Sequence, residues 1–222
     1  MDTDARDEVA DILEARSGAY QTLARLWIEE VDEALWQGLV GTAFPAVPDA
    51  PRLDSAYRRL EGCIRNAAPD VLKELAIDYA LLCRGANPVE GADPYESVHR
   101  NQFGLMMQDE WESVLRFYRE VGLERSPSSV EPEDHLGIEL ECMARLCQRL
   151  ATAYGRGDKE GCQDLVQMQL QMLEGHLLVW VPRFVDAVLR ISKTEFYKSV
   201  ATITQEYLLM DREFLQTGIC PL

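Results

Sequence analysis

The chain has 222 residues, of which 47% are hydrophobic and 27% charged, a composition typical of a globular domain with a sizeable core and not of a disordered chain. Its formal net charge of −16 excludes nucleic acid and anionic membranes as expected partners, because like charges repel. The six cysteines form no CxxC pair, the acidic start lacks the apolar segment of a secretory leader, and the longest apolar run, residues 177–181, is too short to span a bilayer. We therefore expect reduced thiols and a cytoplasmic protein.

Apolar residues recur at spacings of three and four along almost the whole chain. Such stripes cover residues 20–31, 72–82, 107–121, 136–150, 173–184 and 197–214. This period is typical of amphipathic helices, and no alternation typical of strands accompanies it. We expect an all-α fold, in which Pro182 breaks or kinks its helix.

Segments rich in glycine and proline separate these helices. They cover residues 42–51, 84–94, 124–132 and 155–161. The segment 84–94, RGANPVEGADP, is the richest, and we expect a hinge within residues 84–104 that joins two helical halves of one domain, residues 1–222. Exchange of these halves between chains would give a homodimer in a mixture with the monomer.

The stretch EPEDH gathers polar side chains directly ahead of an apolar stripe. Pro132 suits the first position of a helix and Glu131 the cap before it, and Glu133 and Asp134 then lie in the first turn, where the helix dipole favours acids. His135 does not fit this account, because a protonated histidine gains nothing from the dipole there. The stretch is either a plain helix start or a helix start that also serves as a site.

Three blocks in a fixed order carry a family resemblance. They are EPEDH with Glu139, Leu140 and Met143; DYALLCRG (78–85) with PYESV (94–98); and HLLVWVPRF (176–184) with FYKSVATITQEYLLMD (196–211). Together they resemble the TorD/DmsD/NarJ family of molybdoenzyme maturation chaperones. In order and spacing, the resemblance covers roughly residues 76–215.

This resemblance implies an all-helical cytoplasmic protein that is not an enzyme and carries no cofactor of its own. It implies binding of the twin-arginine signal peptide of a molybdopterin oxidoreductase subunit, which holds that subunit back from export until its cofactor is loaded. The implied partners are the leader and the body of such a catalytic subunit. Both monomers and dimers occur in the family.

The resemblance also implies binding residues. Carried over position by position, they are Pro132, Asp134, His135, Pro94, Tyr95, Tyr79, Leu82 and Gly104. Glu131 and Glu133 join them on physical grounds, because a leader with two guanidinium groups and an apolar stretch needs carboxylates beside an apolar groove. We expect Asp134 to accept from an arginine and neutral His135 to hydrogen-bond the peptide backbone. Cys83 and His99 stand where the family usually has aromatic residues, and both bear on the shape of the apolar pocket.

The composition alone also allows two other classes of function, a helical metalloenzyme and a generic peptide-binding adaptor. A helical metalloenzyme needs a fuller ligand set than three histidines and the single Glu96–His99 pair supply. A generic helical adaptor for some other peptide is opposed only by the three ordered blocks. The client enzyme is left open, since reductases of dimethyl sulfoxide, trimethylamine oxide or nitrate and formate enzymes all fit.

Overall fold

The computed structural model describes residues 3–85, 91–124 and 130–217, and within these ranges it is helical and contains no strand. The all-α prediction is therefore confirmed. The elements are α1 (Thr3–Ile28), α2 (Glu33–Val40), α3 (Pro51–Arg65), α4 (Val71–Cys83), α5 (Glu96–Arg100), α6 (Asp109–Glu120), α7 (Leu136–Arg156), α8 (Lys159–Met172), the π-helix η1 (Leu173–Leu177), α9 (Leu178–Ile191) and α10 (Glu195–Gln216).

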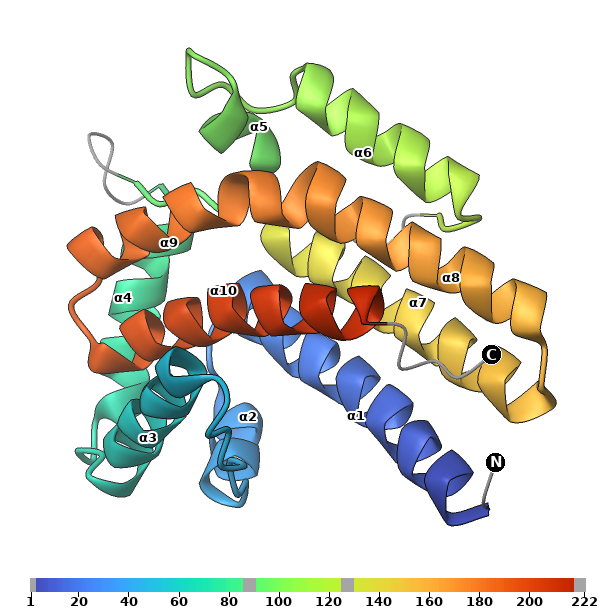
Figure 1. The fold of residues 1–222 in the computed structure, drawn as a ribbon. Coiled ribbons are helices and arrows are strands. Elements are labelled where there is room, and N and C mark those ends of the chain that lie inside the picture. Colours follow the sequence, from blue (N-terminus) through green and yellow to red (C-terminus); the bar gives the residue numbers. More distant parts are fainter. Residues whose placement is uncertain (1–2, 86–90, 125–129, 218–222) are drawn as a thin grey trace.

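Helices from both ends of the chain share one core. α1 packs along α7, and α10 packs against α3 and α9, while α5 and α6 lie on the outer side of the α8–α9 layer (Figure 1). Trp27 of α1 lies at the centre, where its ring meets the edge of Phe184 at 4.9 Å between centroids and its Nε1 donates to the Thr204 hydroxyl at 3.0 Å. The two predicted halves thus share the main hydrophobic cluster, and a smaller one lies between Leu13 of α1 and the second half of α7. Residues 86–90 of the predicted hinge lie outside the described residues, and the hinge stays a prediction.

A buried polar cluster joins α1 to α8 and α10. Arg16 pairs with Asp211, with Nε 2.6 Å from Oδ1, and its Nη2 donates to Gln169 at 2.6 Å. The Tyr20 hydroxyl donates to the same carboxylate at 2.7 Å. A buried charge is tolerated when it is paired and hydrogen-bonded, as Asp211 is here.

Pro182 does not end its helix. It lies inside α9, which continues to Ile191, so a break is wrong, while the alternative of a kink stays a prediction. A proline clashes with the carbonyl four residues earlier, which here is Leu178. Leu178 follows directly on η1, and we attribute the tolerance of Pro182 to this wider turn. α8, η1 and α9 together follow one long curved path (Figure 1).

No helix in the described ranges is both long enough and apolar enough to cross a membrane.

Candidate functional site

The EPEDH stretch packs against Pro94 and Tyr95, which lie within the predicted hinge. An isolated antiparallel bridge joins Tyr95 to His135. The N–H group after Tyr95 donates to the carbonyl of Asp134 at 2.9 Å, and the N–H group after His135 donates to the carbonyl of Pro94 at 2.8 Å. Two segments that the sequence resemblance treated as separate blocks are therefore held side by side.

His135, and not Glu131, is the cap of α7. The helix begins at Leu136, and the Nδ1 of His135 accepts from the Gly137 N–H at 3.1 Å. Pro132 lies four residues before the helix, in a turn closed by the His135 N–H on the Pro132 carbonyl at 3.1 Å. The expected placing of Pro132 at the first helical position is wrong, because the bridge to Tyr95 fixes this turn and leaves the cap to the imidazole.

The capping role requires a neutral ring. Burial lowers the pKa of His135 to about 4, although the charge of Glu131 opposes this. A neutral imidazole keeps a lone pair on Nδ1, which a protonated ring lacks. The expectation of a neutral His135 agrees with this pKa, while its expected contact with a peptide backbone stays a prediction.

Glu131 holds a guanidinium group at the rim of the site. Its Oε1 pairs with Nη1 of Arg84 at 2.6 Å, and its Oε2 accepts from the Tyr95 hydroxyl at 2.6 Å. Burial alone would raise the pKa of Glu131, but Tyr95, His135 and Arg84 outweigh it and lower the pKa, so the carboxylate is ionised at neutral pH. The side chain of Arg84 is 47% exposed and that of Glu131 is 12% exposed. This pair is open to solvent on the arginine side.

The next two acids have partners inside the molecule. Glu133 accepts from Nε1 of Trp111 at 2.7 Å. Asp134 is fully buried, and its Oδ2 accepts from the Ser97 N–H at the start of α5 at 3.0 Å. Burial raises the pKa of Asp134. Direct contact between Asp134 and an arginine of a bound peptide would require α5 to move, so Glu131 is the better placed carboxylate.

The remaining predicted residues are spread more widely. Tyr79 is buried on α4 and donates to the carbonyl of Ile28 at 2.7 Å, and the Arg84 guanidinium lies over its ring at 5.6 Å. Leu82 belongs to the core. Gly104 lies in the loop between α5 and α6 with φ of 63°, outside the Tyr95–His135 bridge. The structure thus brings Pro94, Tyr95 and residues 131–135 together, with Tyr79 connected through Arg84.

Cys83 and His99, which stand where the family usually has aromatic residues, are both packed against neighbouring side chains. Cys83 is buried in the core, and burial raises its pKa, so its thiol acts as a small apolar group. His99 stacks on Trp180 at 5.5 Å between ring centroids, with an interplanar angle of 21°. An imidazole therefore takes the place of an aromatic ring in this stack.

A set of buried acids behind α5 was not expected from the sequence. Glu96 accepts from Nδ1 of His176 at 2.9 Å and pairs with Arg100, and Glu139 accepts from Nε1 of Trp180 at 3.1 Å. Burial and the nearby Glu96 raise the pKa of Glu139 well above its ordinary value. The available signal was Glu139 itself, an acid that lies within an apolar stripe. In the described part of the chain no three His, Cys, Asp or Glu side chains are placed to hold a metal ion.

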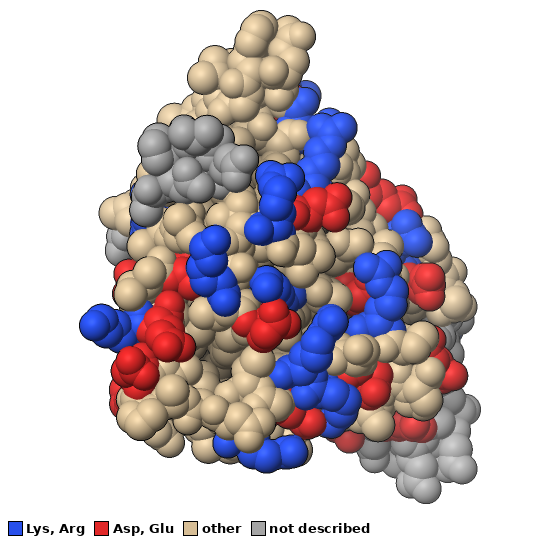
Figure 2. All heavy atoms as spheres, turned by 90° about the vertical axis from the view of Figure 1, so that its left-hand side faces the viewer, with Lys and Arg blue, Asp and Glu red and all other residues tan. Residues whose placement is uncertain are grey.

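An apolar projection lies beyond this acid set. The loop between α5 and α6 exposes Phe103, Leu105, Met106 and Met107. Figure 2 shows an uncharged projection at the top of the molecule, at the height where Figure 1 places this loop, above a face on which basic and acidic side chains alternate. Exposed apolar side chains in such a group are typical of interaction sites.

The fold and the site define an all-helical protein with an arginine-paired carboxylate at the rim of the EPEDH stretch and an exposed apolar loop between α5 and α6. Residues 49–186 match the family described as nitrate reductase delta subunit. The chain is 30% identical to the chaperone protein TorD of Aeromonas salmonicida over 178 residues, which cover 79% of this chain and 74% of the relative. It is 25% identical to the TorD chaperone of Shewanella piezotolerans over 215 residues, 91% and 93% of the two chains. A third TorD chaperone, from Photobacterium profundum, is 28% identical over 146 residues, 66% of each chain.

The chain belongs to this family of nitrate reductase delta subunits and TorD chaperones. Its relatives are named as chaperones and not as enzymes, which agrees with the expectation of a protein without catalysis. The metalloenzyme alternative has no support from these relatives.

Proposed function

We propose that the protein is a cytoplasmic chaperone that binds the twin-arginine leader of a molybdopterin oxidoreductase subunit. Bound in this way, the client is kept from export until its cofactor is inserted and it has folded. Family membership supports a chaperone for such an enzyme. The observation that carries the leader contact is the Glu131–Arg84 pair at the rim of the EPEDH stretch.

Glu131 offers an incoming arginine a carboxylate that already fits a guanidinium group. The Tyr95 hydroxyl donates to Oε2 and fixes the carboxylate. Oε1 faces the half-exposed Arg84, which is the side from which a leader arginine would approach. A leader arginine that displaces Arg84 would leave the carboxylate paired, which avoids the cost of an uncompensated charge. Charge-assisted hydrogen bonds of this kind are the strong ones in peptide recognition.

The exposed loop between α5 and α6 is proposed to receive the apolar stretch of the leader. Phe103, Leu105, Met106 and Met107 supply apolar surface outside the core. Methionine side chains adapt to many shapes, which suits a segment recognised for its apolar character more than for its sequence. Gly104, with its positive φ, gives this loop its turn.

The other predicted residues are proposed to position the contact. Asp134 ties α5 to the EPEDH stretch, and His135 starts α7. Glu133 and Pro132 hold the turn between Glu131 and α7, and Pro94 lies on the segment that faces this turn. Tyr79 of α4 supports the Arg84 guanidinium with its ring, and Leu82 anchors the same helix in the core. The negative surface would steer a cationic leader toward this region.

The test is capture of a client. The purified protein is mixed with leader-bearing catalytic subunits of exported molybdopterin enzymes, each also prepared without its leader. We expect retention of at least one full precursor and much weaker retention of the leaderless form. Equal retention of both forms would contradict leader binding, and retention of unrelated peptides at similar strength would favour the generic adaptor.

A further inference from the structure

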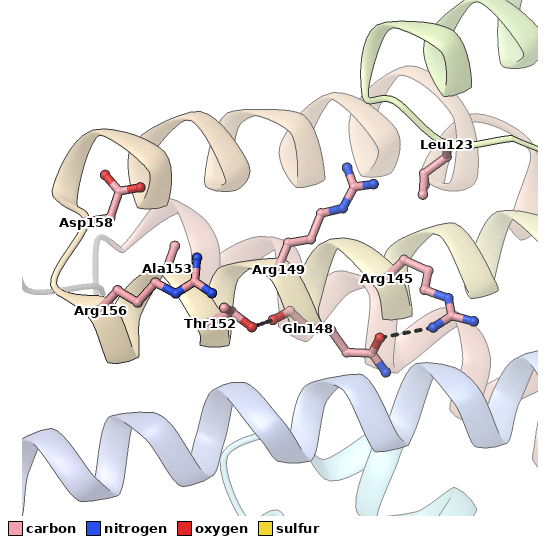
Figure 3. A pocket seen from close by; sticks show the side chains of 8 residues that line it. All are labelled: Leu123, Arg145, Gln148, Arg149, Thr152, Ala153, Arg156 and Asp158. Carbon is pink, nitrogen blue, oxygen red and sulfur yellow. Dashed lines mark hydrogen bonds between the residues drawn. The ribbon is translucent and has the colours of Figure 1, made fainter.

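A cleft rich in arginine lies on α7, far from the EPEDH stretch. It has a volume of about 470 Å³ and is bounded by the second half of α7, by Leu123 after α6 and by Asp158 ahead of α8. Figure 3 shows Arg145, Arg149 and Arg156 projecting from α7 along it. At 1.5 Å per residue, the cleft is about 20 Å along the helix from the cap of α7.

The three arginines outnumber the two acids beside them, which are Glu141, whose ionised form Arg145 favours, and Asp158, which lines the same cleft. Spacings of four and seven residues place them on one face of the helix. No ion pair within 4 Å involves any of them in the described ranges, in a chain whose net charge is −16. Arg149 is fixed by hydrogen bonds to the carbonyls of Val121 and of Gly122, the latter at 3.1 Å, and these neutral acceptors leave its charge in place.

We propose that this cleft binds an extended acidic peptide segment of a partner protein. Along the helix axis the arginines are separated by about 6 Å and then about 10 Å. Side chains two and four residues apart in an extended peptide lie on the same face, at about 6.6 Å and about 13 Å. Carboxylates at these positions can face the first pair of arginines directly and can reach Arg156 through its long side chain. Leu123 and Ala153 supply an apolar floor for the residues between them.

The spacing distinguishes this ligand from a phosphate compound. Compact phosphate sites gather several donors on one point, often at a free helix N-terminus. Here the donors are strung along α7, and the nearby start of α8 is already capped by Asp158, whose Oδ1 accepts from the Gly161 N–H at 2.9 Å.

The inference is independent of leader binding. It assigns a second contact surface, opposite in charge preference to the first, because Glu131 attracts arginine and this cleft attracts carboxylates. A partner that carries both a cationic leader and an acidic segment would be held at two points.

The experiment uses a blocked peptide with the sequence Gly-Asp-Leu-Asp-Leu-Gly-Leu-Asp-Gly, labelled for fluorescence anisotropy, in which all three aspartates lie on one face of the extended chain. One control peptide has asparagine in place of each aspartate, and another has the three aspartates adjacent. We expect the full chain to bind the first peptide at least about tenfold more tightly than either control, with an affinity that falls as salt is raised.

The matched variants are Arg145→Gln/Arg156→Gln and Arg52→Gln. The double variant leaves the structural Arg149 intact, so its melting temperature should match that of the wild type, and it should bind the acidic peptide at least about tenfold more weakly. Arg52 is an exposed arginine on α3, paired with Glu206, and its variant should bind like the wild type. Three results would overturn the proposal. The double variant could bind with wild-type affinity, the asparagine peptide could bind as well as the aspartate peptide, or pyrophosphate could displace the labelled peptide at a lower concentration than the unlabelled peptide does. Leader titration of the double variant should be unchanged, which separates this result from a failure of the leader proposal.

Discussion

At the residue scale, the cap of α7 is made by an unusual side chain. Caps are commonly serine, threonine, aspartate or asparagine, and His135 takes that role here through Nδ1. Its pKa is lowered to about 4 by burial, so the folded protein keeps the ring neutral where an unfolded chain would begin to protonate it. The cap is therefore coupled to pH.

This coupling predicts a loss of stability in acid. Below about pH 6.5 the unfolded state takes up a proton on His135 that the folded state refuses until about pH 4, so stability present above pH 6.5 is lost as the pH falls. Relative to His135→Asn, which keeps a capping side chain, the wild type should lose roughly 2–3 kcal/mol between pH 7.5 and pH 4.5. Urea unfolding at several pH values measures the free energy of unfolding of both proteins. Taking the difference removes the contribution of the carboxylates that the two proteins share. Parallel pH profiles of the two proteins would contradict the assignment.

A second prediction at this scale concerns Glu131. Replacing it with glutamine keeps the shape but removes the charge that pairs with arginine, which should weaken binding of a twin-arginine leader about 10- to 150-fold. Glu61→Gln is the matched control, because Glu61 also pairs with an arginine, Arg58, at 2.6 Å but lies on α3. Calorimetric titration of both variants with the leader peptide measures the loss of affinity, and a thermal melt shows whether stability has changed as well. An equal loss of affinity in both variants would mean that only the overall charge matters.

At the element scale, the contact between α1 and α7 depends on a glycine. A Cβ at position 137 would lie 2.2 Å from Cγ1 of Ile28 and 3.0 Å from the carbonyl oxygen of Ala24. The first turn of α7 therefore approaches α1 more closely than any other residue type allows. This approach also fixes where the EPEDH stretch lies.

Two glycine-to-alanine changes in α7 should have opposite effects. Gly137→Ala should destabilise the protein by about 1–3 kcal/mol, because the new methyl group overpacks the contact. A Cβ at Gly155 meets nothing within 4 Å, so Gly155→Ala should stabilise it by up to about 1 kcal/mol through helix propensity. Chemical unfolding measures both, and similar changes of the same sign would show that the α1–α7 contact is not tight.

Several long helices were predictable from the sequence, while α2, α3, α5, α8 and the starts of some others were not. The apolar stripes gave α1, α4, α6, α7 and α10 because burial of one face repeats with the helical period. The start of α7 was misplaced, because Pro132 looks like a first helical residue when the distant Tyr95 is not in view. The break expected at Pro182 was wrong for a related reason, since the π turn before it leaves no mark in composition.

At the scale of the whole molecule, the largest helix contacts cross the predicted hinge. α1 packs on α7, and α3 packs on α10, so each half of the chain completes the core of the other. The clustering of Pro94, Tyr95 and residues 131–135 follows from this arrangement. The family resemblance had named Pro94, Tyr95, Pro132, Asp134 and His135, and the need for carboxylates had added Glu131 and Glu133. The Arg84–Glu131 pair and the buried Glu96 and Glu139 were not anticipated, because such partners come from separate elements that sequence spacing does not relate.

This arrangement predicts exchange between chains. If residues 84–94 open, the first half of one chain can form the same contacts with the second half of another, at little cost in contacts. We expect a mixture of monomer and dimer that depends on concentration and on recovery from acid or denaturant. Light scattering coupled to gel filtration measures it, and a monomer under every condition would contradict the exchange.

The central claim is that the EPEDH region recognises the paired arginines of a leader. The most direct measurement is calorimetric titration of the wild-type protein with the leader peptide of a client and with the same peptide carrying lysines in place of both arginines. Lysine keeps the charge but lacks the planar fork that a carboxylate such as Glu131 engages. We predict that the twin-lysine peptide binds at least about tenfold more weakly and that the difference between the two peptides disappears in Glu131→Gln. Equal affinity for both peptides in the wild type, or a difference that persists in the variant, would contradict the account.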